Sequence, residues 1–326
     1  MKFIEITKPG GSEVLTINSK EIPQIGADEV LISVKAAGVN RPDVLQREGK
    51  YPMPKGVTPI PGLEVAGIIT AIGKNVTSFS VGDKVCALTN GGGYAEFYAV
   101  PYTQVLPIPS TISFVEAAAI PETFFTVWAN LFDRGNASQK DTVLIHGGAS
   151  GIGTTALTLC KALGINAIST VGSDDKVDAL KAFGTIINYK KLDFENEILS
   201  ITKGEGVDVI LDIVGAPYFN RNLNILKKDG RLVIIGYMGG RVVENFDLQQ
   251  LMLKRLIVTG TTMRSRTAEE KQLIANGLIA NVWPLIEANL CKPLIYKVFP
   301  FENVKEAHQA IDKGDHIGKI VLSLEN

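Results

Sequence analysis

One segment constrains the fold more than any other. Residues 141–164 read DTVLIHGGASGIGTTALTLCKALG, in which an apolar run enters a glycine-rich turn that passes directly into a helical pattern. From Gly148 to Gly153 the turn follows a Gly-x-Gly-x-x-Gly frame with Ser150 at the second glycine position. Small residues there let the main chain approach a pyrophosphate, and the N–H groups at the start of the helix face the anion. The segment predicts a dinucleotide-binding βαβ unit; the alternative is a glycine turn that serves only helix–strand packing.

The rest of the chain divides around this segment. Residues 123–264 alternate apolar strands with amphipathic helices, which predicts a doubly wound parallel sheet of α/β class. Residues 1–122 show short strands separated by Gly and Pro, which predicts a β-rich domain. Residues 265–326 contain two helical stretches and a final strand, GKIVLSLE, which we expect to pair back into the β-rich domain. The sheet domain is therefore inserted in a β-rich domain made of 1–122 and 265–326.

Composition excludes several classes of protein. The net charge of -1 offers no basic excess for a nucleic acid, and no run approaches the roughly 20 apolar residues that span a bilayer. The first residues lack the apolar core of a signal peptide. The three cysteines are an odd number without a CxxC pair, which argues against disulfides. We therefore expect a cytoplasmic protein that acts on a small molecule.

The end of the second strand of the sheet domain bears on the choice between NADP and NAD. An NAD site has an acidic residue there, whereas this chain has Gly172, so no carboxylate repels a 2′-phosphate. The side chains that could donate to that phosphate are those of Ser173, Lys176 and Tyr189. The sequence therefore favours NADPH. Two alternatives stay open: Asp174 and Asp175 only begin the next helix beside a solvated Lys176, or Asp174 binds the ribose of NAD.

Several segments of the sequence resemble one known family of proteins. The segments AAGVNRPDVLQREGKYP, PGLEVAGII, GDKVCAL, AAAIPETFFTVW and DGRLVIIGYMGG are similar to the quinone oxidoreductase branch of the medium-chain dehydrogenase/reductase superfamily. The resemblance is strongest to the tumour-suppressor-induced NADPH quinone oxidoreductases, and zeta-crystallin is more distant. It implies a GroES-like fold for the β-rich domain, a Rossmann fold for the inserted domain, and NADPH in the cleft between them.

The resemblance also implies a zinc-independent enzyme. Zinc members need a Cys and a His-Glu pair, because a catalytic zinc takes three protein ligands. This chain has Asn40 in place of the cysteine and Leu63 before Glu64 in place of the histidine. The histidines, His146, His308 and His316, lack ligand spacing, and His146 is expected to be a buried histidine of the core. We predict no metal site.

Roles for individual residues follow from the same resemblance. Asn40 would lie near the nicotinamide, and the Tyr51 hydroxyl would donate a hydrogen bond to a quinone oxygen as negative charge develops there. The alternative for Tyr51 is a loop tyrosine packed under prolines, and for Arg264 it is a solvated turn. The residues implied to bind or line the cofactor are Thr126, Ser150, Gly151, Ile152, Gly172, Ser173, Lys176, Tyr189, Val214, Gly236, Met238, Met263 and Arg264.

The predicted activity is NADPH-dependent reduction of quinones, by hydride or single-electron transfer. An enal or enone reductase is the first alternative, because a sparse, partly apolar cleft would also admit an α,β-unsaturated carbonyl. A low-turnover NADPH-binding protein of the zeta-crystallin type is the second. The segment RLIVTGTTM, residues 255–263, is apolar on both faces and would leave a long edge on the sheet. We therefore expect a homodimer.

Overall fold

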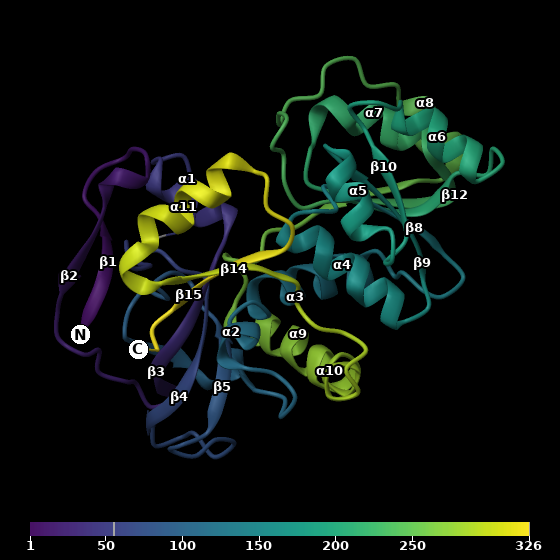
Figure 1. Ribbon diagram of the computed structural model, residues 1–326. Helices are drawn as coiled ribbons and strands as arrows, with labels where there is room; N and C mark the ends of the chain where they lie inside the picture. Colours follow the sequence, from purple (N-terminus) through teal and green to yellow (C-terminus); the bar gives the residue numbers. More distant parts are fainter. Residues whose placement is uncertain (55, 326) are drawn as a thin grey trace. The chain divides into compact units, whose positions relative to one another are not determined.

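A computed structural model describes residues 1–54 and 56–325. The chain forms two compact units (Figure 1). Unit 1 comprises Met1–Phe125 and Arg264–Asn326, and unit 2 comprises Thr126–Met263. The sequence places the two junctions after residues 122 and 264, and the structure places them after Phe125 and Met263.

Unit 2 is built on a six-stranded sheet in which every neighbouring pair is parallel. The order is β10-β9-β8-β11-β12-β13, which is 3-2-1-4-5-6 when counted from the first strand of the unit. This is the doubly wound order of dinucleotide-binding domains, and it confirms the predicted fold class. The strands are β8 (Thr142–His146), β9 (Asn166–Val171), β10 (Thr185–Asn188), β11 (Val207–Asp212), β12 (Leu226–Ile234) and β13 (Ile257–Gly260).

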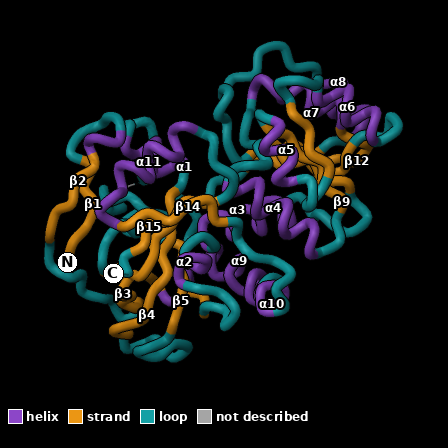
Figure 2. The backbone as a smooth tube through the Cα atoms, viewed as in Figure 1, coloured by secondary structure: helices purple, strands orange, loops and turns teal. Residues whose placement is uncertain are grey.

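Helices cover both faces of this sheet, as Figure 2 shows. The helices α6, α7 and α8 pack side by side, and α4 and α5 lie on the opposite face. The core between them contains strand residues such as Leu144, Ile168 and Ile210, because a sheet covered on both faces buries both rows of side chains. The helical segments are η3 (Trp128–Arg134), α4 (Gly151–Ala162), α5 (Asp174–Leu180), α6 (Phe194–Ile201), α7 (Ala216–Ile225) and α8 (Leu248–Lys254).

Unit 1 contains a seven-stranded sheet whose main path is β14-β15-β3-β4-β5-β7, with β6 paired to β3. The strand β15 (Lys319–Ser323) pairs antiparallel with β3 (Glu29–Val39), so the prediction that the last strand returns to the β-rich domain is confirmed. The other strands are β1 (Lys2–Ile6), β2 (Leu15–Ser19), β4 (Glu64–Ile72), β5 (Lys84–Leu88), β6 (Phe97–Pro101), β7 (Val105–Pro107) and β14 (Ile295–Pro300).

The tail of unit 1 contains one more helix than the sequence predicts. The stretch expected as one helix in the tail is two, α9 (Ala268–Asn281) and α10 (Trp283–Glu287). Pro284 has no N–H and its ring would clash in a helix interior, so it begins a new helix. The other helical segments are α1 (Arg41–Arg47), α2 (Phe114–Ala117), α3 (Pro121–Val127), α11 (Val304–Lys313), η1 (Ser12–Val14), η2 (Tyr102–Gln104) and η4 (Phe301–Asn303). Among the described residues, no helix has the length and apolar character needed to cross a bilayer.

Candidate functional site

The glycine-rich turn of unit 2 leads into α4 as the sequence predicts. Ser150 is the residue that caps this helix, and its Oγ accepts a hydrogen bond from the Gly153 N–H at 3.0 Å. Ser150, Gly151 and Ile152 are all half-buried at the start of a twelve-residue helix. The first N–H groups of a helix have no partner within it, so this turn offers donors to an anion.

Two glycines of the turn are required by packing. A Cβ on Gly153 would lie 2.3 Å from the Gly147 carbonyl oxygen, and one on Gly148 would lie 2.2 Å from Ser169 Oγ. The packing alternative therefore accounts for both of these glycines. It does not account for the small residues Ser150 and Gly151, which are the ones that a bound pyrophosphate would contact.

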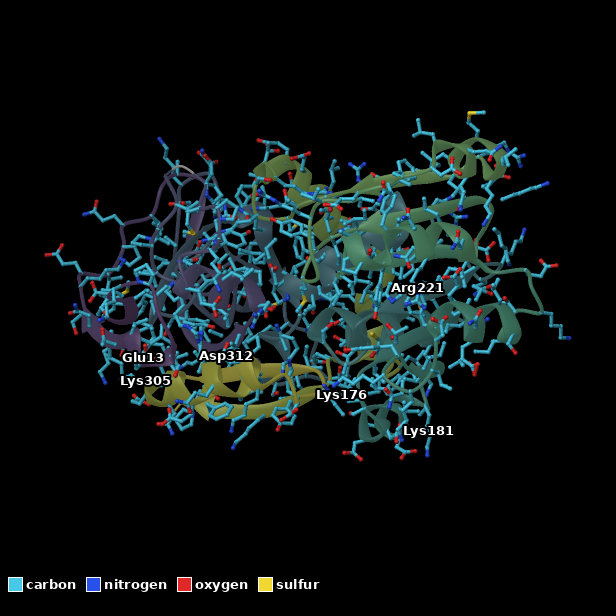
Figure 3. All side chains as sticks on the ribbon, turned by 90° about the horizontal axis from the view of Figure 1, so that it is seen from above. Glu13, Lys176, Lys181, Arg221, Lys305 and Asp312 are labelled. Carbon is cyan, nitrogen blue, oxygen red and sulfur yellow. The ribbon has the colours of Figure 1, made fainter. Side chains whose placement is uncertain are left out.

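The end of β9 brings several predicted residues together. A Cβ on Gly172 would lie 3.0 Å from the Tyr189 hydroxyl, so that hydroxyl faces the glycine. Ser173 caps α5 without using its side chain for the cap, and Lys176 follows in the first turn of the helix, where Figure 3 labels it. Lys190, which no sequence pattern indicated, lies here too, and its Cε would lie 3.6 Å from the same Cβ. Hydroxyl and ammonium donors thus lie together at the end of β9, where Gly172 stands in place of the acidic residue of an NAD site.

Asp174, the residue that would bind the ribose of NAD, is engaged elsewhere. Its Oδ1 accepts a hydrogen bond from Asn188 Nδ2 at 2.7 Å, and its Oδ2 pairs with the Lys191 ammonium. The hydrogen bond from Lys191 is the main cause that holds the pKa of the Asp174 carboxyl below its usual value. A carboxylate already bound in this way is a poor ribose acceptor, which weakens the NAD alternative.

A buried polar network holds the loop after β11. Asp212 Oδ1 accepts a hydrogen bond from the Val214 N–H at 2.7 Å, and Asp212 Oδ2 accepts one from Asn222 Nδ2 at 3.2 Å. The Asn222 Oδ1 in turn lies 2.8 Å from His146 Nε2. Burial lowers the pKa of His146 to about 4, so the ring is neutral at pH 7. The expectation that His146 is a satisfied core histidine is confirmed, and its network positions Val214.

The loop after β12 lies next to this one. The Met238 N–H donates to the Ile213 carbonyl oxygen at 3.0 Å, and Gly239 donates to Val214 at 2.8 Å. A hollow of about 350 Å³ opens at the carboxyl ends of β12 and β13, the end at which doubly wound sheets bind ligands. Its lining residues are Ile234, Ile235, Gly236, Tyr237, Gly260, Thr261 and Thr262. Of the predicted cofactor residues, Gly236 lines the hollow, whereas Val214 and Met238 lie in the loops beside it.

Thr126 and Met263 mark the two ends of unit 2. The Thr126 carbonyl oxygen accepts from Asn130 Nδ2 at 2.8 Å, and Asn130 Oδ1 accepts from the Thr261 hydroxyl at 2.6 Å. Asn130 therefore ties Thr126 to the rim of the hollow. Met263 is buried.

In unit 1, Asn40 belongs to a buried charged trio with Glu64 and Lys319. Asn40 Nδ2 donates to Glu64 Oε1 at 2.9 Å, and Lys319 Nζ donates to the same oxygen at 2.6 Å and to Asn40 Oδ1. Lys319 comes from β15, at the far end of the sequence, and no sequence pattern pointed to it. The cation beside Glu64 is thus an ammonium. Among the described residues, no group of three His, Cys, Asp or Glu side chains is arranged to hold a metal ion. That the enzyme needs no zinc stays a prediction, which rests on Asn40 and Leu63 at the places of two zinc ligands.

The backbone of Asn40 is fixed by Asp43. The Asp43 Oδ2 accepts the Asn40 N–H at 2.9 Å, which begins α1, and it also lies 3.2 Å from the Tyr94 hydroxyl. Burial raises the pKa of Asp43 to about 6, against hydrogen bonds that favour the carboxylate. The fixed start of α1 sets the direction of the helix that carries Gln46.

Tyr51 and Arg264 lie together within unit 1. The Arg264 Cζ is 5.0 Å from the centroid of the Tyr51 ring, and Arg264 is buried. Its Nη2 donates to the Asn90 carbonyl oxygen at 2.9 Å and its Nη1 to Gln46 Oε1 at 3.2 Å. The alternative of a solvated turn for Arg264 is therefore wrong. Its hydrogen bonds are to unit 1, whereas the other predicted cofactor residues belong to unit 2.

Replacing Lys319 by Met should destabilise the protein, because Glu64 would keep a buried charge without its partner. Removing one member of a buried ion pair costs about 3–5 kcal/mol, and at this chain length that lowers the thermal midpoint by roughly 4–7 °C. Thermal unfolding followed by circular dichroism measures the midpoint. Lys313→Met at the exposed end of α11 is the control, and Glu64→Gln combined with Lys319→Met should recover part of the loss. An unchanged midpoint for Lys319→Met would contradict this account.

Comparison with known proteins agrees with the architecture. Residues 26–110 match the family model of the alcohol dehydrogenase GroES-like domain, and residues 151–278 match that of zinc-binding dehydrogenases. Quinone oxidoreductase from Mus musculus is 33% identical over 99% of this chain and 98% of its own length, and that from Homo sapiens is 30% identical over the same shares.

Solved structures give the same result. Escherichia coli quinone oxidoreductase complexed with NADPH is 29% identical, with a TM-score of 0.85 over 99% of this chain and 100% of that one. The CurK enoyl reductase is 28% identical, with a TM-score of 0.85 over 99% and 98%. The assignment to the tumour-suppressor-induced subgroup is finer than these matches and stays a prediction. The chain belongs to the medium-chain dehydrogenase/reductase superfamily, among the relatives of quinone oxidoreductase, and is an oxidoreductase.

Proposed function

We propose that the protein reduces quinones with NADPH. The observation that carries the cofactor choice is the end of β9, where Gly172 faces the Tyr189 hydroxyl and Asp174 is held by Asn188 and Lys191. A 2′-phosphate there would meet hydroxyl and ammonium donors instead of a free carboxylate. The solved quinone oxidoreductase from Escherichia coli, which is complexed with NADPH, supports the same choice.

The residues of unit 2 fit the rest of the cofactor. The turn from Ser150 to Ile152 would bind the pyrophosphate through main-chain donors, while Ser173, Lys176 and Tyr189 would hold the 2′-phosphate. Val214, Gly236, Met238, Thr126 and Met263 would line the remaining length of the dinucleotide. When bound, NADPH supplies the reducing electrons, as a hydride or singly. The protein supplies binding and orientation.

The residues of unit 1 would serve the acceptor. Tyr51 would donate a hydrogen bond to the acceptor oxygen as negative charge develops there. Burial raises the pKa of Tyr51 above its usual value, although the Arg264 guanidinium opposes that rise. Because the net shift is upward, the hydroxyl keeps its proton at neutral pH. Asn40, with both side-chain polar atoms bound to Glu64 and Lys319, would form a fixed wall near the nicotinamide. The curated relatives named quinone oxidoreductase support a quinone as acceptor.

One further activity has an observation in its favour. The structural similarity to the CurK enoyl reductase supports an enal or enone reductase as the second candidate. Both acceptors carry an oxygen that gains negative charge during reduction, so the same hydrogen-bond donor would serve either.

We also propose a homodimer and a cytoplasmic location. The strand β13 is at the edge of its sheet, with Ile257 55% exposed, and Met252 on α8 is 75% exposed. An exposed apolar edge strand favours pairing with a second copy of the chain. The three cysteines are all buried and unpaired, as is usual in a reducing compartment.

NADPH and NADH oxidation at 340 nm, with an ortho-quinone, a para-quinone and a 2-alkenal, tests the activity and the cofactor choice together. We expect quinone turnover that prefers NADPH. Lys176→Ala should weaken NADPH binding about tenfold, or ~1.4 kcal/mol, and leave NADH unchanged, because only NADPH carries the 2′-phosphate. Lys181→Ala, at the end of the same helix and paired with Asp178, is the control (Figure 3).

The outcomes of this assay separate the candidates. Consumption of the alkenal alone would identify an enone reductase. NADPH binding without turnover of any acceptor would mean a binding protein of low activity, and an equal preference for NADH would refute the assigned 2′-phosphate site.

Replacing Ile257 by Glu should dissociate the dimer, because a charge on the edge strand would have to be buried without a partner. Sedimentation velocity should show a dimer for the wild type and a monomer for the variant. Val81→Glu, at an exposed apolar residue of unit 1, is the control and should remain dimeric. A wild-type monomer would rule out the dimer.

A further inference from the structure

The side chain of Arg264 is held by two parts of unit 1. Its two terminal nitrogens donate to the Asn90 carbonyl oxygen and to Gln46 Oε1. Gln46 is itself fixed, because its Nε2 donates to the Pro59 carbonyl oxygen at 2.8 Å. The guanidinium therefore has one orientation, set by α1 and by the turn that contains Asn90.

A buried lysine supports this arrangement from α9. Lys271 Nζ donates to Asn90 Oδ1 at 2.6 Å and lies 3.5 Å from the Arg264 carbonyl oxygen, and Lys271 is only 1% exposed. Burial lowers the pKa of Lys271 to about 8. Gly91 makes room for the arginine: its φ is +101°, and a Cβ there would lie 2.8 Å from Arg264 Nη2. A side chain at Gly91 would displace the guanidinium.

The hydrogen bonds of Arg264 go to neutral acceptors, although the guanidinium is buried. Its Nε is buried too and has no hydrogen-bond partner among the described residues. The nearby Glu122 is a weak counter-charge, because burial, and then the charge of Glu64, raise the pKa of Glu122 to about 8. A buried cation of this kind is costly for stability, and such groups occur mostly where function needs them.

The guanidinium lies over the ring of Tyr51, with Arg264 Cζ 5.0 Å from the ring centroid. An arginine over an aromatic face holds that ring in place. Burial is the main cause that raises the pKa of Tyr51, the charge of Arg264 acts to lower it, and the charges of Glu122 and Asp43 act to raise it. A phenol next to a cation is a stronger hydrogen-bond donor.

We propose that Arg264 is a positioning residue for the acceptor rather than a ligand of the cofactor. It fixes the Tyr51 ring and strengthens the hydroxyl as a donor to an oxygen that gains negative charge. Tyr51 and Arg264 form a site that Asn90, Gln46 and Lys271 support. This site would thus select acceptors that become phenolates or enolates on reduction. This inference rests on the proposed function, because it specifies the chemistry of the same acceptor site.

Steady-state kinetics of the full-length protein test the assignment, with Arg264→Gln, Tyr51→Phe, the double variant, and Arg266→Gln as the control. Arg264→Gln should lower kcat with a quinone about 10- to 100-fold, less than the roughly 100- to 1,000-fold loss when a donor to a developing oxyanion is itself removed, while Kd for NADPH changes less than twofold. The double variant should lose little more than the larger single loss, because the two residues act as a unit. Arg264→Lys keeps the charge and should recover part of kcat. A Kd for NADPH raised tenfold with kcat unchanged, or multiplicative losses in the double variant, would overturn the proposal.

A second measurement does not depend on turnover. The absorbance change of 4-nitrophenolate on binding to the protein without NADPH reports an oxyanion at this site. Arg264→Gln and Tyr51→Phe should each weaken that binding at least tenfold, and Arg266→Gln should not. Equal binding by Arg264→Gln and the wild type would overturn the role of Arg264. This result stands even if the wild type reduces no quinone, so it separates a failure of this inference from a failure of the proposed function.

Discussion

The buried carboxylate of Glu64 is the constraint on which unit 1 depends. Its Oε1 accepts from Asn40 Nδ2 and Lys319 Nζ, and its Oε2 accepts from the Glu122 N–H at 2.9 Å. A charge with no solvent exposure is tolerated only with such complete pairing, so the four segments that supply these groups must come together. Strand β15 is thereby fixed against β3, and α1 begins where Gln46 can reach Arg264. The acceptor chemistry that we propose for Tyr51 is built on this arrangement.

Unit 2 relies on main-chain donors in place of buried charge pairs. Ser150 and Asp212 each accept hydrogen bonds from backbone N–H groups and so fix the loops after β8 and β11, at the carboxyl ends of the strands. His146 contributes from the core, as a neutral ring in the network that ends at Asp212. Among the predicted cofactor residues of unit 2, Lys176 is the charged one, and it lies in the helix that follows β9, where a 2′-phosphate would need a cation. Unit 1 thus relies on buried charges around the proposed acceptor site, whereas unit 2 relies on main-chain donors around the proposed NADPH site.

Local patterns predicted the parts of the protein that local interactions determine. The strand–turn–helix around Gly153 depends on neighbours within one βαβ unit, and the alternation of strands with helices and the apolar run that contains His146 are local patterns, so the turn, the parallel sheet and the burial of His146 could be predicted from the sequence. The break at Pro284 could have been found from the proline alone. The roles of Lys319 and Lys271 could not, because their partners lie 255 and 181 residues away along the chain. For the same reason the sequence left a solvated turn open as the alternative for Arg264: its burial depends on Asn90 and Gln46, which no spacing connects to it.

The central claim is that NADPH bound by this chain reduces a quinone under enzymatic control. The most direct test is anaerobic reduction of an ortho-quinone with NADPH that carries deuterium on one or the other face of nicotinamide C4. The account predicts that deuterium is lost from one face only, at a rate well above that without protein. Loss from both faces alike, or oxidation no faster than in buffer, would contradict it.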